Sequence, residues 1–113
     1  MTDATTTVAA HKAAIRRFAA DRAWDPFHTP KNLVMALASE VGELCDLFRW
    51  LTADESVAAG DDPAQRSAIA DELADVANIV FLLSEHTGID LSQALTVKLA
   101  KNAIKYPAPT GES

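Results

Sequence analysis

The stretch LVMALASEVGELCDLFRWL, residues 33–51, decides the fold of this 113-residue chain. Its apolar side chains recur every three or four positions, which is the period of an amphipathic helix rather than the alternation of a strand. Thr29 and Pro30 precede it and are residue types preferred at a helix N-cap and first helical position. The sequence therefore predicts a long helix over residues 30–51.

Three further segments have the same period, and we expect helices over residues 8–23, 63–86 and 91–105. Prolines or glycines stand between them, and the polar stretch before residue 63 has room for one short helical turn. The chain has no stretch with the alternation of a strand. These patterns predict an all-α fold, with four main helices in a single domain over residues 1–107 and a flexible tail over residues 108–113.

Composition and charge exclude several classes of function. Sixteen acidic side chains against ten basic ones give a net charge of −6, which repels a nucleic acid polymer. No apolar run reaches the roughly 20 residues of a membrane span, and the N-terminus MTDATTT lacks the basic and apolar regions of a signal peptide. We therefore expect a cytoplasmic protein with no nucleic acid or membrane partner.

The chain is short for a self-contained core. A monomer of about this length buries only about two-thirds of the surface that its unfolded chain exposes. Association of identical chains would bury more, so the length favours a homo-oligomer. The single cysteine, Cys45, cannot form an intrachain disulfide, and because it lies in an apolar stretch we expect it to be a small core residue.

Two pairs of carboxylates interrupt the apolar stripes of the two longest predicted helices. Glu40 lies at the centre of the apolar face of the first, and Glu43 lies at its shoulder, three residues on. Glu72 and Asp75 share the apolar side of the second. Charged side chains on such helices normally face solvent, so this placement predicts four acids directed into one part of the fold.

Four buried acids need a counter-charge, because an isolated buried carboxylate costs several kcal/mol or takes up a proton. With oxygen donors and no histidine or cysteine at matching spacing, the acids favour the hard ions Mg²⁺ or Mn²⁺. Two other interpretations remain open. Acidic pairs three residues apart also occur on solvated helix faces. A di-iron bundle also uses inward carboxylates, although neither Glu40 nor Glu72 has the histidine three residues on that such proteins use.

Four phrases surround these acids in a consistent order: RAWDPFHTPKNL at residues 22–33, SEVGELCDLFRW at 39–50, DELADV at 71–76 and KLAKNAIKYP at 98–107. The acids themselves form the pattern ExxE, followed after a gap by ExxD. On both counts the sequence resembles the MazG-like all-α nucleoside triphosphate pyrophosphohydrolases, and more closely their dCTP pyrophosphatase branch. The resemblance extends over residues 16–107.

The resemblance implies a helical subunit that dimerises through its long helices, with a tetramer, as a dimer of dimers, favoured over a dimer. It implies hydrolysis of a nucleoside triphosphate, dCTP or a related pyrimidine nucleotide, to the monophosphate and pyrophosphate. The cofactor would be Mg²⁺, with Mn²⁺ as a substitute. Removal of unwanted nucleotides from the cellular pool is the physiological role that it suggests.

The resemblance also implies roles for individual residues. The four acids would hold the metal ion, and Glu43 would accept the proton of the attacking water. Trp24 and Trp50 would stack on the base, and Asn32 would supply a polar contact. The alternative for the two tryptophans is that they fill the core or a subunit interface. A row on one face of the last helix would contact the phosphate oxygens and consists of Lys98, Asn102, Lys105 and Tyr106.

Two positions depart from the vertebrate-type members of that branch. Ile15 stands where a base-contacting histidine is expected, and Ile79, at the edge of the substrate site, stands where a tyrosine is expected. Both changes remove a polar group, which leaves the choice of base open. Within the same enzyme class, dUTP or phosphoribosyl-ATP is an alternative substrate, because related helical acid sites hydrolyse these compounds. A non-catalytic helical dimerisation module is the alternative from a different class, although its interface needs no acids at the centre. Among the histidines, His28 is expected to bond to backbone, and His11 and His86 have no assigned partner.

Overall fold

The computed structural model describes residues 1–109, and over that range it contains helices and no strand. Five α-helices follow one another within this range: α1 (Val8–Asp21), α2 (Pro30–Asp46), α3 (Ala53–Ala58), α4 (Pro63–Thr87) and α5 (Leu91–Lys105). Two 3₁₀ helices in the same part of the chain are η1 (Asp25–Phe27) and η2 (Ala59–Asp61). The predicted all-α class is therefore confirmed, and α3 is the short helix expected between α2 and α4.

Local side-chain chemistry explains where these helices begin and end. A hydroxyl or carboxylate side chain accepts a hydrogen bond from the backbone at the start of each α-helix, and these N-cap residues are Thr7, Thr29, Thr52, Asp62 and Asp90. Gly88 ends α4 in the left-handed conformation, at φ 70°, which glycine adopts without strain. Helix α2 ends at Asp46 rather than at the predicted residue 51, because the chain turns through residues 47–50.

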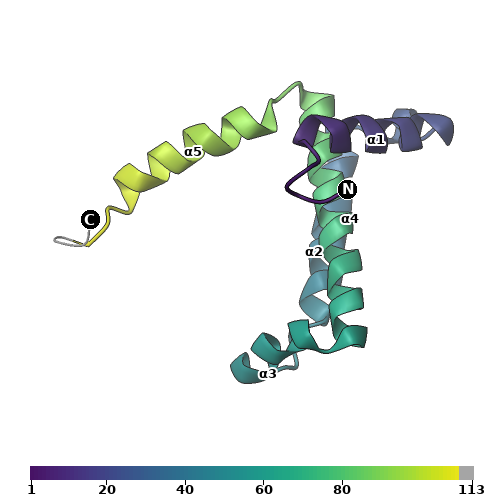
Figure 1. Ribbon diagram of the computed structural model, residues 1–113. Coiled ribbons are helices and arrows are strands. Elements are labelled where there is room, and N and C mark those ends of the chain that lie inside the picture. Colours follow the sequence, from purple (N-terminus) through teal and green to yellow (C-terminus); the bar gives the residue numbers. More distant parts are fainter. Residues whose placement is uncertain (110–113) are drawn as a thin grey trace.

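The antiparallel pair of α2 and α4 forms the centre of the subunit, and α1 crosses α4 near its C-terminal end (Figure 1). Lys12 of α1 stabilises this crossing, because its ammonium donates to the hydroxyl of Ser84 at 2.6 Å and lies 3.9 Å from the carboxylate of Glu85. The Ser84 hydroxyl donates in turn to the carbonyl oxygen of Ile89. Helix α1 is thereby held across the end of α4.

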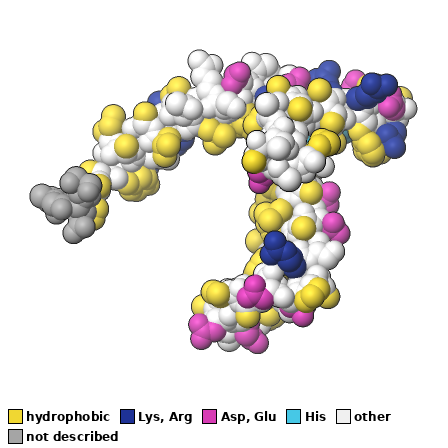
Figure 2. Space-filling model, in the orientation of Figure 1, with side chains coloured by type: hydrophobic (Ala, Val, Ile, Leu, Met, Phe, Trp, Pro, Cys, Tyr) yellow, Lys and Arg dark blue, Asp and Glu magenta, His cyan; other side chains and the backbone are white. Residues whose placement is uncertain are grey.

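Helix α5 projects away from the α2–α4 pair and makes few contacts with the rest of the chain (Figure 1). Its apolar side chains are accordingly exposed, among them Leu95, Leu99 and Ile104. Figure 2 shows hydrophobic side chains along this arm. The radius of gyration is 17.2 Å, compared with roughly 13 Å for a compact domain of this length. The four main helices therefore do not close into a bundle within one chain.

The core of the single chain is small. Its buried apolar side chains among the described residues are Ala19, Leu33, Ala59 and Leu82. Cys45, which we expected in the core, is exposed. That expectation is wrong for the single chain, because the described residues leave the Cys45 side chain uncovered.

Two expectations concern the chain as a whole. Within residues 1–109, none of the helices combines the length and the apolarity that a membrane span requires. The division into a domain over residues 1–107 and a flexible tail over 108–113 stays a prediction. Residues 110–113 of that tail lie outside the described residues.

Candidate functional site

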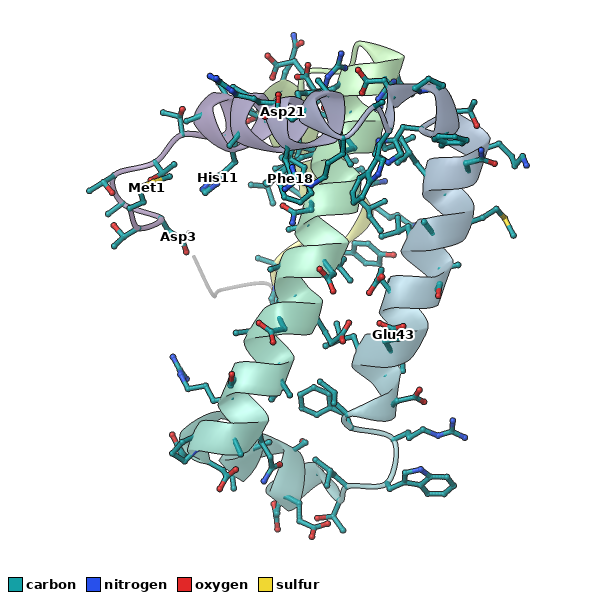
Figure 3. All side chains as sticks on the ribbon, turned by 90° about the vertical axis from the view of Figure 1, so that its right-hand side faces the viewer. Met1, Asp3, His11, Phe18, Asp21 and Glu43 are labelled. Carbon is teal, nitrogen blue, oxygen red and sulfur yellow. The ribbon has the colours of Figure 1, made fainter. Side chains whose placement is uncertain are left out.

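Three of the four predicted acids meet between α2 and α4. Glu40, Glu43 and Glu72 each place a carboxylate oxygen within 4.8 Å of the others, and we call these three residues the carboxylate cluster. Glu40 and Glu43 are neighbours on one surface of α2 because they are three residues apart, and Glu72 lies opposite on α4. Figure 3 labels Glu43 on α2, which runs beside α4.

Burial differs among the four acids. Glu40 and Glu72 are half-buried, whereas Glu43 and Asp75 are exposed. The expectation that all four acids are buried is therefore wrong for the single chain. The physical reason is that the helices around Asp75 enclose an open cavity rather than a packed core.

Burial and crowding raise the pKa of two of these carboxyls. The pKa of Glu40 is raised from 4.5 to about 7, first by burial and then by the neighbouring carboxyls of Glu43, Asp75 and Glu72. Burial, followed by the charge of Glu43, also raises the pKa of Glu72. The Oε2 atoms of Glu40 and Glu72 are buried without a hydrogen-bond partner. A cation would satisfy both atoms, and a donor set of oxygen alone fits a hard divalent ion.

A cavity of about 670 Å³ lies beside the carboxylate cluster, and its volume is within the range of small-molecule sites. Glu40 and Asp75 lie at one end of it, where α2 and α4 face each other. The other end, beneath α1 and the η1 segment, is lined by the aromatic side chains of Phe18, Trp24 and Phe27. The cavity thus offers a charged end and an aromatic end to one elongated ligand.

Three of the predicted substrate contacts line this cavity. Trp24 lies at its aromatic end, edge-on to Phe18, with ring centroids 5.6 Å apart. The side-chain amide of Asn32 donates to the carbonyl oxygen of Phe27 at 3.0 Å, which holds η1 against the start of α2. Ile79 forms part of the α4 wall. The structure brings these residues together, and their contact with a substrate stays a prediction.

The remaining predicted contacts lie outside the cavity. Trp50 is 82% exposed and follows the end of α2, whereas Trp24 precedes its start. The 17 residues of α2 separate them by about 25 Å, so the two rings cannot hold one base between them within a single chain. The four predicted phosphate contacts on α5 also lie apart from the carboxylate cluster, because α5 projects from the subunit. We call these residues the α5 row, and they are Lys98, Asn102, Lys105 and Tyr106.

Several cavity residues were not identified from the sequence as contacts. His11 and Phe18 line the cavity from α1, on either side of Ile15, whose position the sequence had already related to base contact. The spacing of four and three is the signal that places all three on one helix face. Asn78 adds an amide from α4. His28 also lines the cavity, and its Nδ1 is buried without a hydrogen-bond partner, so the expected bond to backbone is not formed at that atom.

Comparison with known proteins agrees with this architecture. The profile of the MazG-like family matches residues 35–113, and the chain belongs to the MazG-like family. It is 42% identical over 96 residues to dCTP pyrophosphatase 1 of Homo sapiens, a match that covers 85% of this chain and 56% of that protein. The corresponding protein of Bos taurus is 40% identical over 90 residues, covering 80% of this chain and 53% of the relative. The chain therefore spans about half the length of these curated relatives.

A solved structure shares the fold. It is a pyrophosphatase from Archaeoglobus fulgidus, with a TM-score of 0.79 and 32% sequence identity. The match covers 85% of this chain and 88% of that one. The predicted membership of the MazG-like family, first indicated by the ExxE and ExxD pattern, is confirmed.

Proposed function

We propose that this protein is a Mg²⁺-dependent nucleoside triphosphate pyrophosphohydrolase, which uses water to cleave its substrate to the monophosphate and pyrophosphate. The observation that carries the proposal is the carboxylate cluster at one end of a cavity of about 670 Å³. Carboxylates and a triphosphate repel each other unless a divalent cation lies between them, whereas a base suits the aromatic end. A nucleotide would therefore bind with its phosphates toward Glu40 and its base toward Trp24.

The four acids would have two roles in the reaction, metal binding and proton acceptance. Glu40, Glu43, Glu72 and Asp75 would hold Mg²⁺, for which Mn²⁺ could substitute. When bound, the ion would offset the charge of the triphosphate and activate a water molecule for attack. Glu43 is the exposed member of the carboxylate cluster, and we assign its carboxylate as the acceptor of the proton of that water.

We infer that the substrate is dCTP or a related pyrimidine triphosphate. The relatives from Homo sapiens and Bos taurus are named for dCTP. In this chain the amides of Asn32 and Asn78 line the cavity, and an amide can both donate to and accept from the edge of a base. Ile15 and Ile79 are apolar and offer the base no hydrogen bond, which leaves the choice of base open. The alternative substrate for the same site is dUTP or phosphoribosyl-ATP.

The large accessible surface area of the single chain supports a homo-oligomer. The chain exposes 8508 Å², whereas a folded monomer of 12.1 kDa exposes roughly 6,000 Å². The excess of roughly 2,500 Å² is comparable to the area that stable protein interfaces bury. Figure 2 shows hydrophobic side chains on α5 and on the α2–α4 arm. We therefore infer that further copies of the chain cover these faces, as a dimer of dimers in preference to a dimer.

Such an assembly would also bring Trp50 and the α5 row to the substrate cavity of a neighbouring copy. Trp50 and the α5 row are exposed or half-exposed and do not line the cavity of their own chain. In the oligomer they would reach the cavity of a neighbouring copy, with Trp50 at the base and Lys98, Asn102, Lys105 and Tyr106 at the phosphates.

Mixed oligomers test this arrangement. Glu43→Gln chains and Lys98→Ala chains should each be inactive alone. If Lys98 acts on the neighbouring copy, random pairing of the two variants restores about a quarter of wild-type activity, because a mixed dimer then contains one intact site. If Lys98 acts within its own chain, mixing restores nothing.

A product screen over the common ribonucleoside and deoxyribonucleoside triphosphates, with Mg²⁺ and anion-exchange separation of the products, tests the activity. We expect equimolar monophosphate and pyrophosphate, with the highest kcat/KM for a pyrimidine nucleotide. Release of diphosphate and orthophosphate, or no hydrolysis of any nucleotide, would overturn the proposal.

The non-catalytic dimerisation module makes a different prediction. It should show no shift in melting temperature with Mg²⁺ and a non-hydrolysable nucleotide, whereas a ligand at 100 times its Kd stabilises its protein by about 2.7 kcal/mol. Removal of unwanted nucleotides in the cytoplasm stays the predicted physiological role.

A further inference from the structure

A second group of ligand-type side chains lies at the C-terminal end of α4. Asp25, His28 and His86 each place one oxygen or nitrogen within 4.8 Å of the others, and we call these residues the His–Asp cluster. Asp25 and His28 belong to the η1 segment between α1 and α2, whereas His86 lies in the last turn of α4. The two imidazole rings are nearly perpendicular, at 89°, with centroids 6.1 Å apart. Two segments that are remote in sequence thus present three metal-binding side chains to one another.

Local backbone geometry explains why Asp25 and His28 lie side by side. The backbone N–H of His28 donates to the carbonyl oxygen of Asp25 at 3.1 Å, which closes the 3₁₀ turn of η1. Side chains three residues apart are eclipsed in this geometry. The bond from Asn32 to the Phe27 carbonyl holds the same turn against α2. The two side chains therefore face α4 as a preformed pair.

The polar atoms of this cluster are buried without partners. Asp25 Oδ1, His28 Nδ1 and His86 Nε2 have no hydrogen-bond partner. Elsewhere in the described part of the chain, the same condition is found only at the Oε2 atoms of Glu40 and Glu72. An unpaired buried polar atom costs free energy, and one cation bound by all three side chains would offset that cost most simply.

We propose that the His–Asp cluster binds a divalent ion of the zinc type, at a site separate from the carboxylate cluster. Two imidazole nitrogens and one carboxylate oxygen form a donor set that Zn²⁺ prefers and that Mg²⁺ does not. Three protein ligands leave the fourth tetrahedral position to water. Ligand atoms around a tetrahedral zinc lie roughly 3.5 Å apart, so the side chains need to move by only about 1 Å.

The position of this site gives it a structural role. Along α4, Glu72 and His86 are about 21 Å apart, so an ion at the His–Asp cluster does not contact phosphates held at the carboxylate cluster. It joins η1 to the end of α4. The Trp24 ring lies edge-on to that of His28, with centroids 6.1 Å apart. The ion therefore holds in place the segment that lines the aromatic end of the cavity.

A metal-free arrangement is the competing explanation. In that explanation the imidazole N–H groups of His28 and His86 donate hydrogen bonds to the Asp25 carboxylate after a small side-chain movement, and no ion is bound. Zinc uptake by the wild type that is lost when either histidine is replaced therefore separates the two explanations.

Calorimetric titration of ZnCl₂ into metal-stripped protein tests the proposal. The protein carries no histidine tag, and millimolar Mg²⁺ is present because it occupies oxygen-only sites and does not compete for imidazole nitrogen. We expect one Zn²⁺ per chain and a raised melting temperature in the wild type. His86→Ala and His28→Ala should lose both effects, whereas His11→Ala, which changes the third histidine of the chain, should keep both.

Zinc X-ray absorption on the wild type decides the outcome even where a variant fails to fold. We expect two imidazole nitrogens at about 2.0–2.1 Å from the metal. The proposal is overturned if the wild type takes up no zinc in the presence of Mg²⁺, if folded His86→Ala binds zinc as the wild type does, or if the zinc ligands are all oxygen. Because the readout is zinc occupancy and coordination rather than hydrolysis, failure here is distinguishable from failure of the proposed enzymatic function.

Discussion

The middle of α4 and its C-terminal end carry two clusters that are similar in burial and different in donor chemistry. The carboxylate cluster joins α4 to α2, and the His–Asp cluster joins α4 to η1; in both, buried polar atoms lack hydrogen-bond partners. The first offers oxygen alone and lies beside the charged end of the cavity. The second adds two nitrogens, and only its His28 reaches the cavity wall. Burial thus shows where a cation is needed, and the donor atoms decide which cation suits the site.

The largest expected effect lies in the carboxylate cluster. Glu43→Gln keeps the side-chain shape, removes one charge and should lower turnover by at least ~100-fold, the range for losing a metal-held or proton-accepting group. Zinc uptake at the His–Asp cluster should be unchanged. Steady-state kinetics with Mg²⁺ measures the loss, and Asp71→Asn, which changes an exposed acid next to Glu72, is the matched control. Wild-type turnover of Glu43→Gln would exclude Glu43 from the site.

Trp24 lies between the two regions, since it lines the cavity and also contacts His28 edge-on. Trp24→Ala should raise KM for every accepted triphosphate by ~10-fold or more, because lost base stacking is worth ~1–3 kcal/mol and an aromatic face does not distinguish bases. Trp24→Phe keeps a ring and should recover much of the loss. A fall in kcat with an unchanged KM would show instead that Trp24 acts on the geometry of the site.

The melting temperature of the metal-free protein should depend on pH through the raised pKa of Glu40 in the carboxylate cluster. The pKa of Glu40 is raised from 4.5 to about 7, chiefly by burial, so between these values the folded state keeps a proton that the unfolded chain has released. This contribution to the stability of the metal-free protein is complete below pH 4.5 and is lost as the pH rises through about 7. Melting temperatures with EDTA should therefore fall over that interval, and less in Glu40→Gln. Equal slopes in both proteins would mean that Glu40 is not the titrating group.

The smallest expected effect concerns the cavity wall between the clusters. Ile79→Tyr adds a hydroxyl one turn beyond Asp75 on α4, and a hydroxyl can prefer one pattern of donors and acceptors on a base. It should change the ratio of kcat/KM between dCTP and dUTP rather than the general level. Assays of both nucleotides at saturating Mg²⁺ measure the ratio, with Ile79→Phe as the control that adds a ring alone. An unchanged ratio would show that position 79 does not contact the base.

The carboxylate cluster could be predicted because its members follow helical spacing. Glu40 and Glu43 are three residues apart, and Glu72 occupies the matching stripe of the next long helix. The His–Asp cluster could not be predicted in this way. His86 has no partner within a helical turn, and the residues that it meets lie in a 3₁₀ turn far away in the sequence.

Helices, N-caps and acidic stripes can be derived from the amino-acid sequence, because each depends on interactions within about four residues along the chain. Three other features depend on tertiary packing: α5 leaves the subunit, Trp24 and Trp50 lie at opposite ends of α2, and Asp25, His28 and His86 meet. The physical reason is that helix crossings are set by burial between segments distant in sequence. The period of the apolar residues indicates which side of each helix is apolar. It does not indicate which other helix, or which copy of the chain, packs against that side.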